Sequence, residues 1–230
     1  MDQVILYSIF GVLLIVGIIY AIRFGNAETE RRRAEWAAWA TSKNFTYHDL
    51  PGVQKWYGTA APVAPEELVG HFRPLIAAPS ATCHRYHTGT VANRPVIFFE
   101  SWYVVSTGKS SYTVYHTITT TPVKPGLPSF TIRKQGLWDN IKAFFGSHDI
   151  LIGDEDFDNQ FYISCSDENY IKLLLNTEAK SILRKRDAAM WRCKDGNLVV
   201  TEVGSLTPQN IDPLLDLTTQ FGNLIDRNSW

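Results

Sequence analysis

The 230-residue sequence has nearly balanced charge, with a formal net charge of -1 and a pI near 6.6. It lacks the overall basic field that nucleic-acid-binding domains use, so no nucleic-acid partner is predicted. Hydrophobic residues make up 45% of the chain and aromatic residues 13%. This composition is sufficient for one domain with its own hydrophobic core.

The first segment, Val4–Ile22, carries no charge over nineteen residues. A helix of that length is roughly 28 Å long, close to the ~30 Å hydrocarbon core of a bilayer, which predicts a transmembrane helix. No Lys or Arg precedes the segment, whereas Arg23 and Arg31–Arg33 follow it. The positive-inside rule then places the N-terminus outside. The sequence therefore predicts a single-pass cell-membrane protein with an anchor over residues 1–25 and a cytoplasmic C-terminal domain.

Two alternatives to a membrane anchor remain open for this segment. It could be a signal peptide cleaved near Ala27, although such peptides have a basic start and a shorter apolar core. It could also be a buried core helix, although little protein lies beside the N-terminus to cover it. The three cysteines, Cys83, Cys165 and Cys193, are widely spaced and odd in number. This usage fits a reducing compartment rather than a disulfide framework.

A juxtamembrane helix is predicted over residues 26–43, after an interruption at Gly25-Asn26. Its basic and aromatic residues are close to the predicted membrane exit, where they can contact anionic lipid headgroups. These membrane-interface candidates are Arg31, Arg32, Arg33, Trp36 and Trp39. In the alternative, the two tryptophans pack on the following domain, and their helical spacing fits both roles.

Residues 44–230 are predicted to form one α+β domain with a mainly antiparallel sheet and packed helices. A proline-rich stretch comes first, with one helical turn at Pro65–Leu68. Strands are expected over Thr82–Val91, Pro95–Val105, Ser111–Thr121, Phe130–Arg133, His148–Ile152, Phe161–Cys165, Ala188–Cys193 and Asn197–Val203. Helices are expected over Gly136–Phe145, over Asp167–Leu175, over Glu178–Arg186 with Thr177 as its cap, and from Asp212 onward. The last helix carries an apolar stripe that is expected to pack on the sheet, formed by Leu214, Leu217, Phe221 and Leu224.

Three short motifs suggest chemistry that their context excludes. Gly108-Lys109-Ser110 resembles the end of a phosphate loop, but Tyr103 occupies the position of the first glycine and the stretch joins two strands. Asp154–Asp158 resembles a calcium loop, but it lacks the glycine and the glutamate that such a loop requires. Cys83–His87 has metal-like spacing, but on a strand its ends are ~13 Å apart. The sequence therefore predicts no cofactor and no metal.

One constellation remains as a candidate catalytic or metal site. Glu100 lies between Phe98 and Trp102 on an apolar face of the expected central strand. If Val105 pairs with Ser111, Glu100 lies opposite His116, and if Val91 pairs with Val96, it also lies opposite His87. Opposed residues have Cβ atoms about 5 Å apart, so a His–Glu–His cluster could hold a metal or transfer protons. A shift of one residue in either hairpin destroys the alignment.

The second half of the chain resembles a group of uncharacterised bacterial membrane-tethered proteins. The resemblance rests on patterns at Asp156–Asp167, Leu173–Thr177, Ile182-Leu183, Tyr115–Thr121 and Leu127–Phe130. In that group, an acidic strand motif precedes two helices and a hairpin. Thr177 stands where the group usually has proline. The group has no assigned activity, so the resemblance implies no reaction and no site residues.

The sequence thus predicts a membrane-anchored protein whose cytoplasmic domain binds a partner or regulates a membrane process, with no catalytic signature. The predicted partners are the lipid bilayer and a protein. The alternative function is a membrane-tethered hydrolase or metal-dependent enzyme that uses Glu100, His87 and His116.

Overall fold

The computed structural model describes residues 2–49, 82–106, 108, 110–136, 149–205 and 207–228. The predicted helical turn at Pro65–Leu68 and nearly all of the predicted helix Gly136–Phe145 lie outside these ranges. The chain divides into two compact units, residues 1–43 and 44–230, which are described separately.

The first unit is a single helix, α1, which spans Asp2–Lys43. It continues through Gly25-Asn26, so the predicted interruption there is wrong. Within its second half, Arg31 Nη1 lies 3.0 Å from Glu35 Oε1, one helical turn away. Arg33 also pairs with Glu30 at 2.7 Å.

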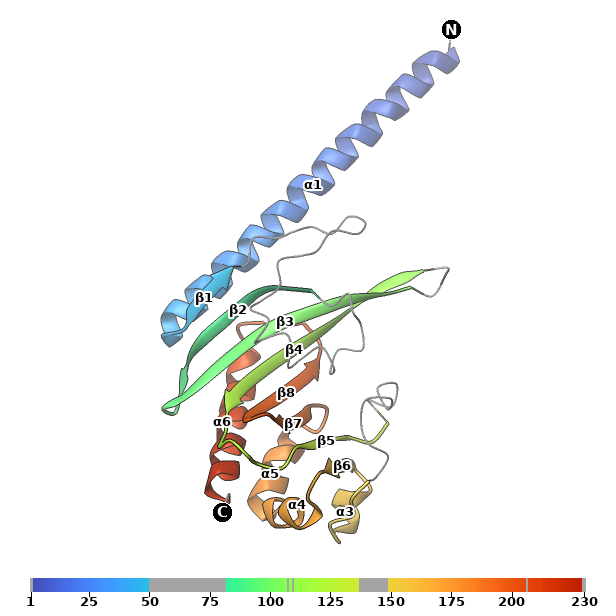
Figure 1. Ribbon diagram of the computed structural model, residues 1–230. Helices are drawn as coiled ribbons and strands as arrows, with labels where there is room; N and C mark the ends of the chain where they lie inside the picture. Colours follow the sequence, from blue (N-terminus) through green and yellow to red (C-terminus); the bar gives the residue numbers. More distant parts are fainter. Residues whose placement is uncertain are drawn as a thin grey trace. The chain divides into compact units, whose positions relative to one another are not determined.

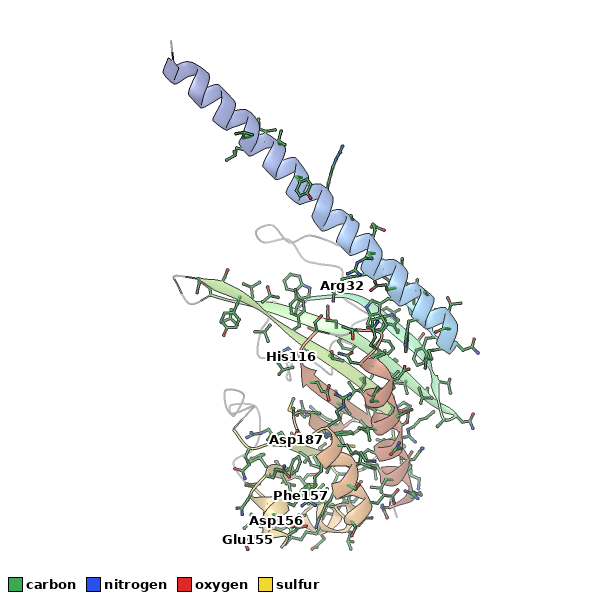
Figure 2. All side chains as sticks on the ribbon, turned by 180° about the vertical axis from the view of Figure 1, so that it is seen from behind. Arg32, His116, Glu155, Asp156, Phe157 and Asp187 are labelled. Carbon is green, nitrogen blue, oxygen red and sulfur yellow. The ribbon has the colours of Figure 1, made fainter. Side chains whose placement is uncertain are left out.

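These ion pairs affect the predicted membrane-interface residues. Two of the three arginines, Arg31 and Arg33, each contact a carboxylate one helical turn away, which offsets much of their charge. Arg32 is labelled on α1 in Figure 2. The rings of Trp36 and Trp39 contact each other edge to face at 5.6 Å, as expected for aromatic residues three positions apart on one helix face.

The predicted transmembrane helix is wrong. Across the described residues, no helix combines the length and the apolar composition needed to cross a membrane. The apolar segment is not an element of its own, because it is the start of α1, which continues into a stretch rich in Glu and Arg.

The second unit is built on one eight-stranded sheet, and the prediction of a mainly antiparallel sheet is confirmed (Figure 1). Every strand pair in it is antiparallel. Its strands, in chain order, are β1 Thr46–Asp49, β2 Thr82–Val91, β3 Arg94–Ser106, β4 Ser111–Pro122, β5 Phe130–Lys134, β6 Phe161–Cys165, β7 Met190–Lys194 and β8 Asn197–Val203. Their order across the sheet is β1-β2-β3-β4-β8-β7-β5-β6.

Two-residue hairpin turns join β2 to β3 and β7 to β8. Ala92 and Asn93 both have positive φ in the turn between β2 and β3, and Asp195 and Gly196 do so between β7 and β8. Two consecutive residues with positive φ match the right-handed twist of the flanking strands, so these two-residue turns fix the register of their hairpins.

One row of paired residues crosses the whole sheet and defines its two faces. The row consists of Tyr47, His87, Phe98, Thr119, Val200, Trp191, Ile132 and Ile163. Because neighbours along a strand point to opposite sides, we call the side that bears this row the helix face and the other side the far face. The far face carries Phe99, Ile118 and Thr201, which are also buried.

In the described ranges, four helices accompany the sheet. They are α3 Glu155–Asp158, α4 Glu168–Leu174, α5 Thr177–Lys185 and α6 Ile211–Arg227. Helix α6 contacts β2, β3, β4 and β8 on the helix face, where the hydroxyl oxygens of Thr119 and Thr218 are 2.8 Å apart. Its predicted apolar stripe is confirmed. The stripe residues Leu214, Leu217, Phe221 and Leu224 are all buried.

Four local predictions differ from the structure. Residues 149–152, part of a predicted strand, form no strand. The acidic segment 154–158 is not an irregular loop, because Asp154 caps the short helix α3 by accepting from the Phe157 N–H. Asn176, rather than Thr177, caps α5. Strand β1 was not predicted, because its four residues give too short a pattern to recognise.

Candidate functional site

The β3–β4 hairpin does not align Glu100 with His116. Ser106 pairs with Ser111, so the register differs by one residue from the predicted one. Glu100 therefore lies opposite Thr117, and His116 lies opposite Ser101. A shift of one residue moves a side chain to the other side of a sheet, so Glu100 lies on the helix face and His116 on the far face. Burial lowers the pKa of His116, which favours its neutral form.

His87 lies on the helix face but two positions from the predicted partner. The tight turn at Ala92-Asn93 pairs Val91 with Arg94, and His87 consequently pairs with Phe98 instead of Glu100. The His87 ring is fully buried and stacks on the Phe98 ring, with centroids 4.3 Å apart and planes 4° apart. This geometry is that of an aromatic packing residue.

The structure therefore does not assemble Glu100, His87 and His116 into one site. His116, labelled in Figure 2, is on the opposite side of the sheet from the other two. Over the described part of the chain, no group of three or more His, Cys, Asp or Glu residues is placed to hold a metal ion. The alternative enzymatic function loses the residues on which it was based.

Glu100 instead takes part in a polar cluster at the start of α6. Its Oε2 accepts a hydrogen bond from Ser205 Oγ at 2.9 Å. The opposed Thr117 donates to the Gly204 carbonyl at 3.3 Å, and Gly204 N–H donates to the Tyr115 carbonyl at 2.8 Å. These bonds fix the connection between β8 and α6 to the central strands.

A second carboxylate, Glu202, completes this cluster. It pairs with Thr117 across β4 and β8 and contacts Arg186 Nη1 at 3.4 Å. Arg186 also donates to the Asn210 carbonyl at 3.5 Å. The sequence did not single out Glu202 or Arg186, because their contact depends on the position of α5 relative to β8.

Desolvation raises the pKa of Glu202 above its ordinary 4.5, and the nearby Arg186 opposes this effect only in part. The folded state then binds the proton more tightly than the unfolded state, so this carboxyl stabilises the fold below its unfolded pKa. That stabilisation is lost as the pH rises through the folded pKa. We expect Glu202→Gln to lose less stability than the wild type between about pH 5 and about pH 7.

Urea unfolding at the two pH values tests this expectation. The exposed Glu178, which pairs with Arg227 at 2.7 Å, provides the control. Glu178→Gln should keep the pH dependence of the wild type. An unchanged pH dependence in Glu202→Gln would show that burial does not control this carboxyl.

The two cysteines with described side chains are poor nucleophiles. Burial raises the pKa of Cys193 to about 12 and also raises that of Cys165. A thiol acts as a nucleophile only as the thiolate, so both groups are essentially unreactive near neutral pH.

The most distinctive exposed feature is the outer part of the β3–β4 hairpin. Among the described residues, pairing of β2 with β3 ends at Trp102, and pairing of β8 with β4 ends at His116. β3 and β4 continue past these neighbours as a two-stranded ribbon, visible in Figure 1. We call residues 103–115 the hairpin arm.

Apolar side chains are exposed on and beside the hairpin arm. Val104 is 51% exposed, Tyr112 is 55% exposed, and Val203 at the end of β8 is 59% exposed. Tyr112 and Val203 both lie on the far face, since Val203 pairs with His116 and Tyr112 is four positions from His116 along β4. The sequence contained one indication of the arm, because the predicted strands Pro95–Val105 and Ser111–Thr121 are longer than the other predicted strands.

Comparison with known proteins gives a likeness of fold. No protein-family model matches the sequence, and no curated protein matches it significantly. Among solved structures, the chain is similar to the crystal structure of the mycobacterial trehalose monomycolate transport factor A, TtfA. The two share 14% sequence identity and a TM-score of 0.54, over 85% of this chain and 93% of the other. At this level of identity the similarity is one of fold.

Proposed function

We propose that this protein is a non-catalytic binding factor in the transport of a sugar-linked lipid, and that it binds a protein partner through the hairpin arm. The similarity to TtfA, a trehalose monomycolate transport factor, supports a role in the transport of a sugar-linked lipid. The exposed hairpin arm supports the mode of action and is the observation that carries the proposal.

The outer edge of β4 can accept an additional strand. No described strand pairs with residues 111–114 of β4 beyond β3, and we propose that their outward N–H and C=O groups form hydrogen bonds with the added strand. Natural proteins usually protect such edges with charged residues or proline. The strands of the arm, 103–106 and 111–115, contain neither, and Lys109 in the turn is the one charged residue between Glu100 and Lys124.

The side chains around this edge favour an apolar partner segment. An extended peptide added beside β4 would continue the line of β8 beyond Val203 and lie next to Tyr112. Strand addition provides affinity through main-chain hydrogen bonds and specificity through alternate side chains. We therefore propose that the occupant is an extended apolar segment of a partner protein.

Site-specific photocrosslinking in the cells that make this protein tests the proposal. A crosslinker at Tyr112 should capture one defined protein that a crosslinker at the equally exposed Leu173 does not capture. The double variant Tyr112→Lys/Val203→Lys should reduce capture, measured with a crosslinker at Val104, by about tenfold or more, because exposed aromatic anchors dominate binding energies. Both substituted positions are more than half exposed, so the fold should be retained.

Equal capture at Tyr112 and Leu173, or capture unaffected by the double variant, would contradict strand addition at the arm. The transport role has a separate test. Cells that carry only the double variant should export less of their trehalose-linked lipid than cells with the wild type. Normal export together with lost partner capture would contradict the transport role and leave the binding role standing.

A further inference from the structure

A hollow of about 460 Å³ lies beside α5, on a part of the domain remote from the hairpin arm. Its lining residues are Asp154, Thr177, Lys180, Ser181, Arg184 and Lys185. The five residues from α5 have the spacing i, i+3, i+4, i+7 and i+8, which places them on one face of the helix. The lining therefore combines three cations, two hydroxyl groups and one carboxylate.

Two of the cations are held in place by their neighbours. Lys180 Nζ donates to Asp154 Oδ2 at 2.8 Å, and Arg184 Nη2 lies 3.9 Å from Asp154 Oδ1. Both cationic groups lie over the ring of the fully buried Phe157, at 5.8 Å and 5.6 Å from its centroid. Such cation–π contacts orient the two side chains before any ligand binds.

Asp154 compensates only part of this positive charge. The hydrogen bonds from Lys180 and from the Phe157 N–H lower the pKa of its carboxyl, so it carries one negative charge at neutral pH. With three cations in the lining, the hollow keeps a surplus of two positive charges.

Most neighbouring carboxylates are engaged elsewhere. Glu178 pairs with Arg227, and Asp187 pairs with Lys134. Asp158 accepts hydrogen bonds from the Ile152 and Gly153 N–H groups. In Figure 2, Glu155 and Asp156 lie farther toward the edge of the molecule than Phe157.

We propose that this hollow binds a phosphate group, carried by a phospholipid headgroup or by a soluble phosphate ester. Arg184 provides a planar fork of N–H donors that matches phosphate oxygens, and Lys185 adds a second full charge. Lys180 uses one of its three donors on Asp154 and directs the others to the ligand. The hydroxyl groups of Thr177 and Ser181 complete the donor set.

Two binding measurements on the full chain test the proposal. The first is calorimetric titration with inorganic phosphate. The second is sedimentation with phosphatidylcholine vesicles that either contain or lack phosphatidylglycerol. Arg184→Gln/Lys185→Gln removes two charges from the hollow, and Lys172→Gln/Lys194→Gln removes two exposed surface charges outside it. Comparing these matched variants separates the hollow from the effect of net charge.

We expect the hollow variant to bind at least about tenfold more weakly than the control variant, because hydrogen bonds to charged groups are strong. A loss with inorganic phosphate alone identifies a soluble ester, and a loss with phosphatidylglycerol vesicles identifies a lipid headgroup. Equal binding by the two variants in both measurements, or no binding by the wild type in either, would overturn the proposal. If the double variant does not fold, Lys185→Gln alone replaces it, since Lys185 is exposed.

Discussion

Replacing Trp191 with alanine is expected to lower the free energy of unfolding by about 3–5 kcal/mol, the range for large-to-small changes at buried aromatic positions. Trp191 is fully buried in β7 and lies in the row of residues that crosses the sheet. Its ring contacts Phe221 of α6 edge to face, with centroids 5.2 Å apart. The substitution therefore opens a cavity between the sheet and the helix that covers it.

Urea unfolding of the full chain, followed by tryptophan-independent far-UV circular dichroism, measures this loss. Leu173→Ala is the control, because Leu173 is 59% exposed on α4. It should change stability by no more than about 0.5 kcal/mol. Similar losses for the two variants would mean that the α6–sheet contact is not the principal core.

Replacing Arg94 with alanine should have the second-largest effect, a loss of about 2–3 kcal/mol, because it leaves a partly buried carboxylate without its cation. Arg94 is 11% exposed and connects the start of β3 to β4 and α6. Nε donates to Thr121 Oγ1 at 3.0 Å, and Nη1 donates to Asn223 Oδ1 at 2.9 Å. Nη2 lies 2.7 Å from Asp226 Oδ2.

Equilibrium unfolding again gives the measurement, with Arg227→Ala as the matched control. Arg227 pairs with Glu178 on the surface of the same helix, and both side chains are more than half exposed. Such a pair contributes about 0–1 kcal/mol. A double-mutant cycle of Arg94→Ala with Asp226→Asn should give a coupling energy of at least about 0.5 kcal/mol. Additive effects would show that Arg94 acts through its other hydrogen-bond acceptors, which are Thr121 Oγ1, Asn223 Oδ1 and the Pro122 carbonyl.

The failure of the Glu100 cluster has a definite physical cause. The sequence identified both strands and the buried position of Glu100, but the pairing depends on which residues form the turns. The first turn contains the two residues Ala92 and Asn93, and the second begins after Ser106. The predicted register of the second hairpin was wrong by one residue. Since side chains alternate between faces, the actual register places Glu100 and His116 on opposite faces of the sheet.

The two binding surfaces proposed above differ in how far the sequence indicated them. The hairpin arm was present in the sequence as two long strands whose outer parts, 103–106 and 111–115, carry no charge, but its exposure depends on where β2 and β8 end. The hollow beside α5 requires two residues from another part of the chain to lie against Lys180 and Arg184. They are Asp154, which caps α3, and Phe157 of α3. Contacts between residues so far apart in the sequence follow from packing and leave no periodic signal.

The sequence by itself determined the α+β class, the antiparallel strands and the apolar stripe of α6, because side-chain periodicity and turn residues act over a few neighbouring positions. The tertiary structure alone decided strand order and register. These features depend on how whole elements meet, and the energies that decide them come from contacts between distant segments.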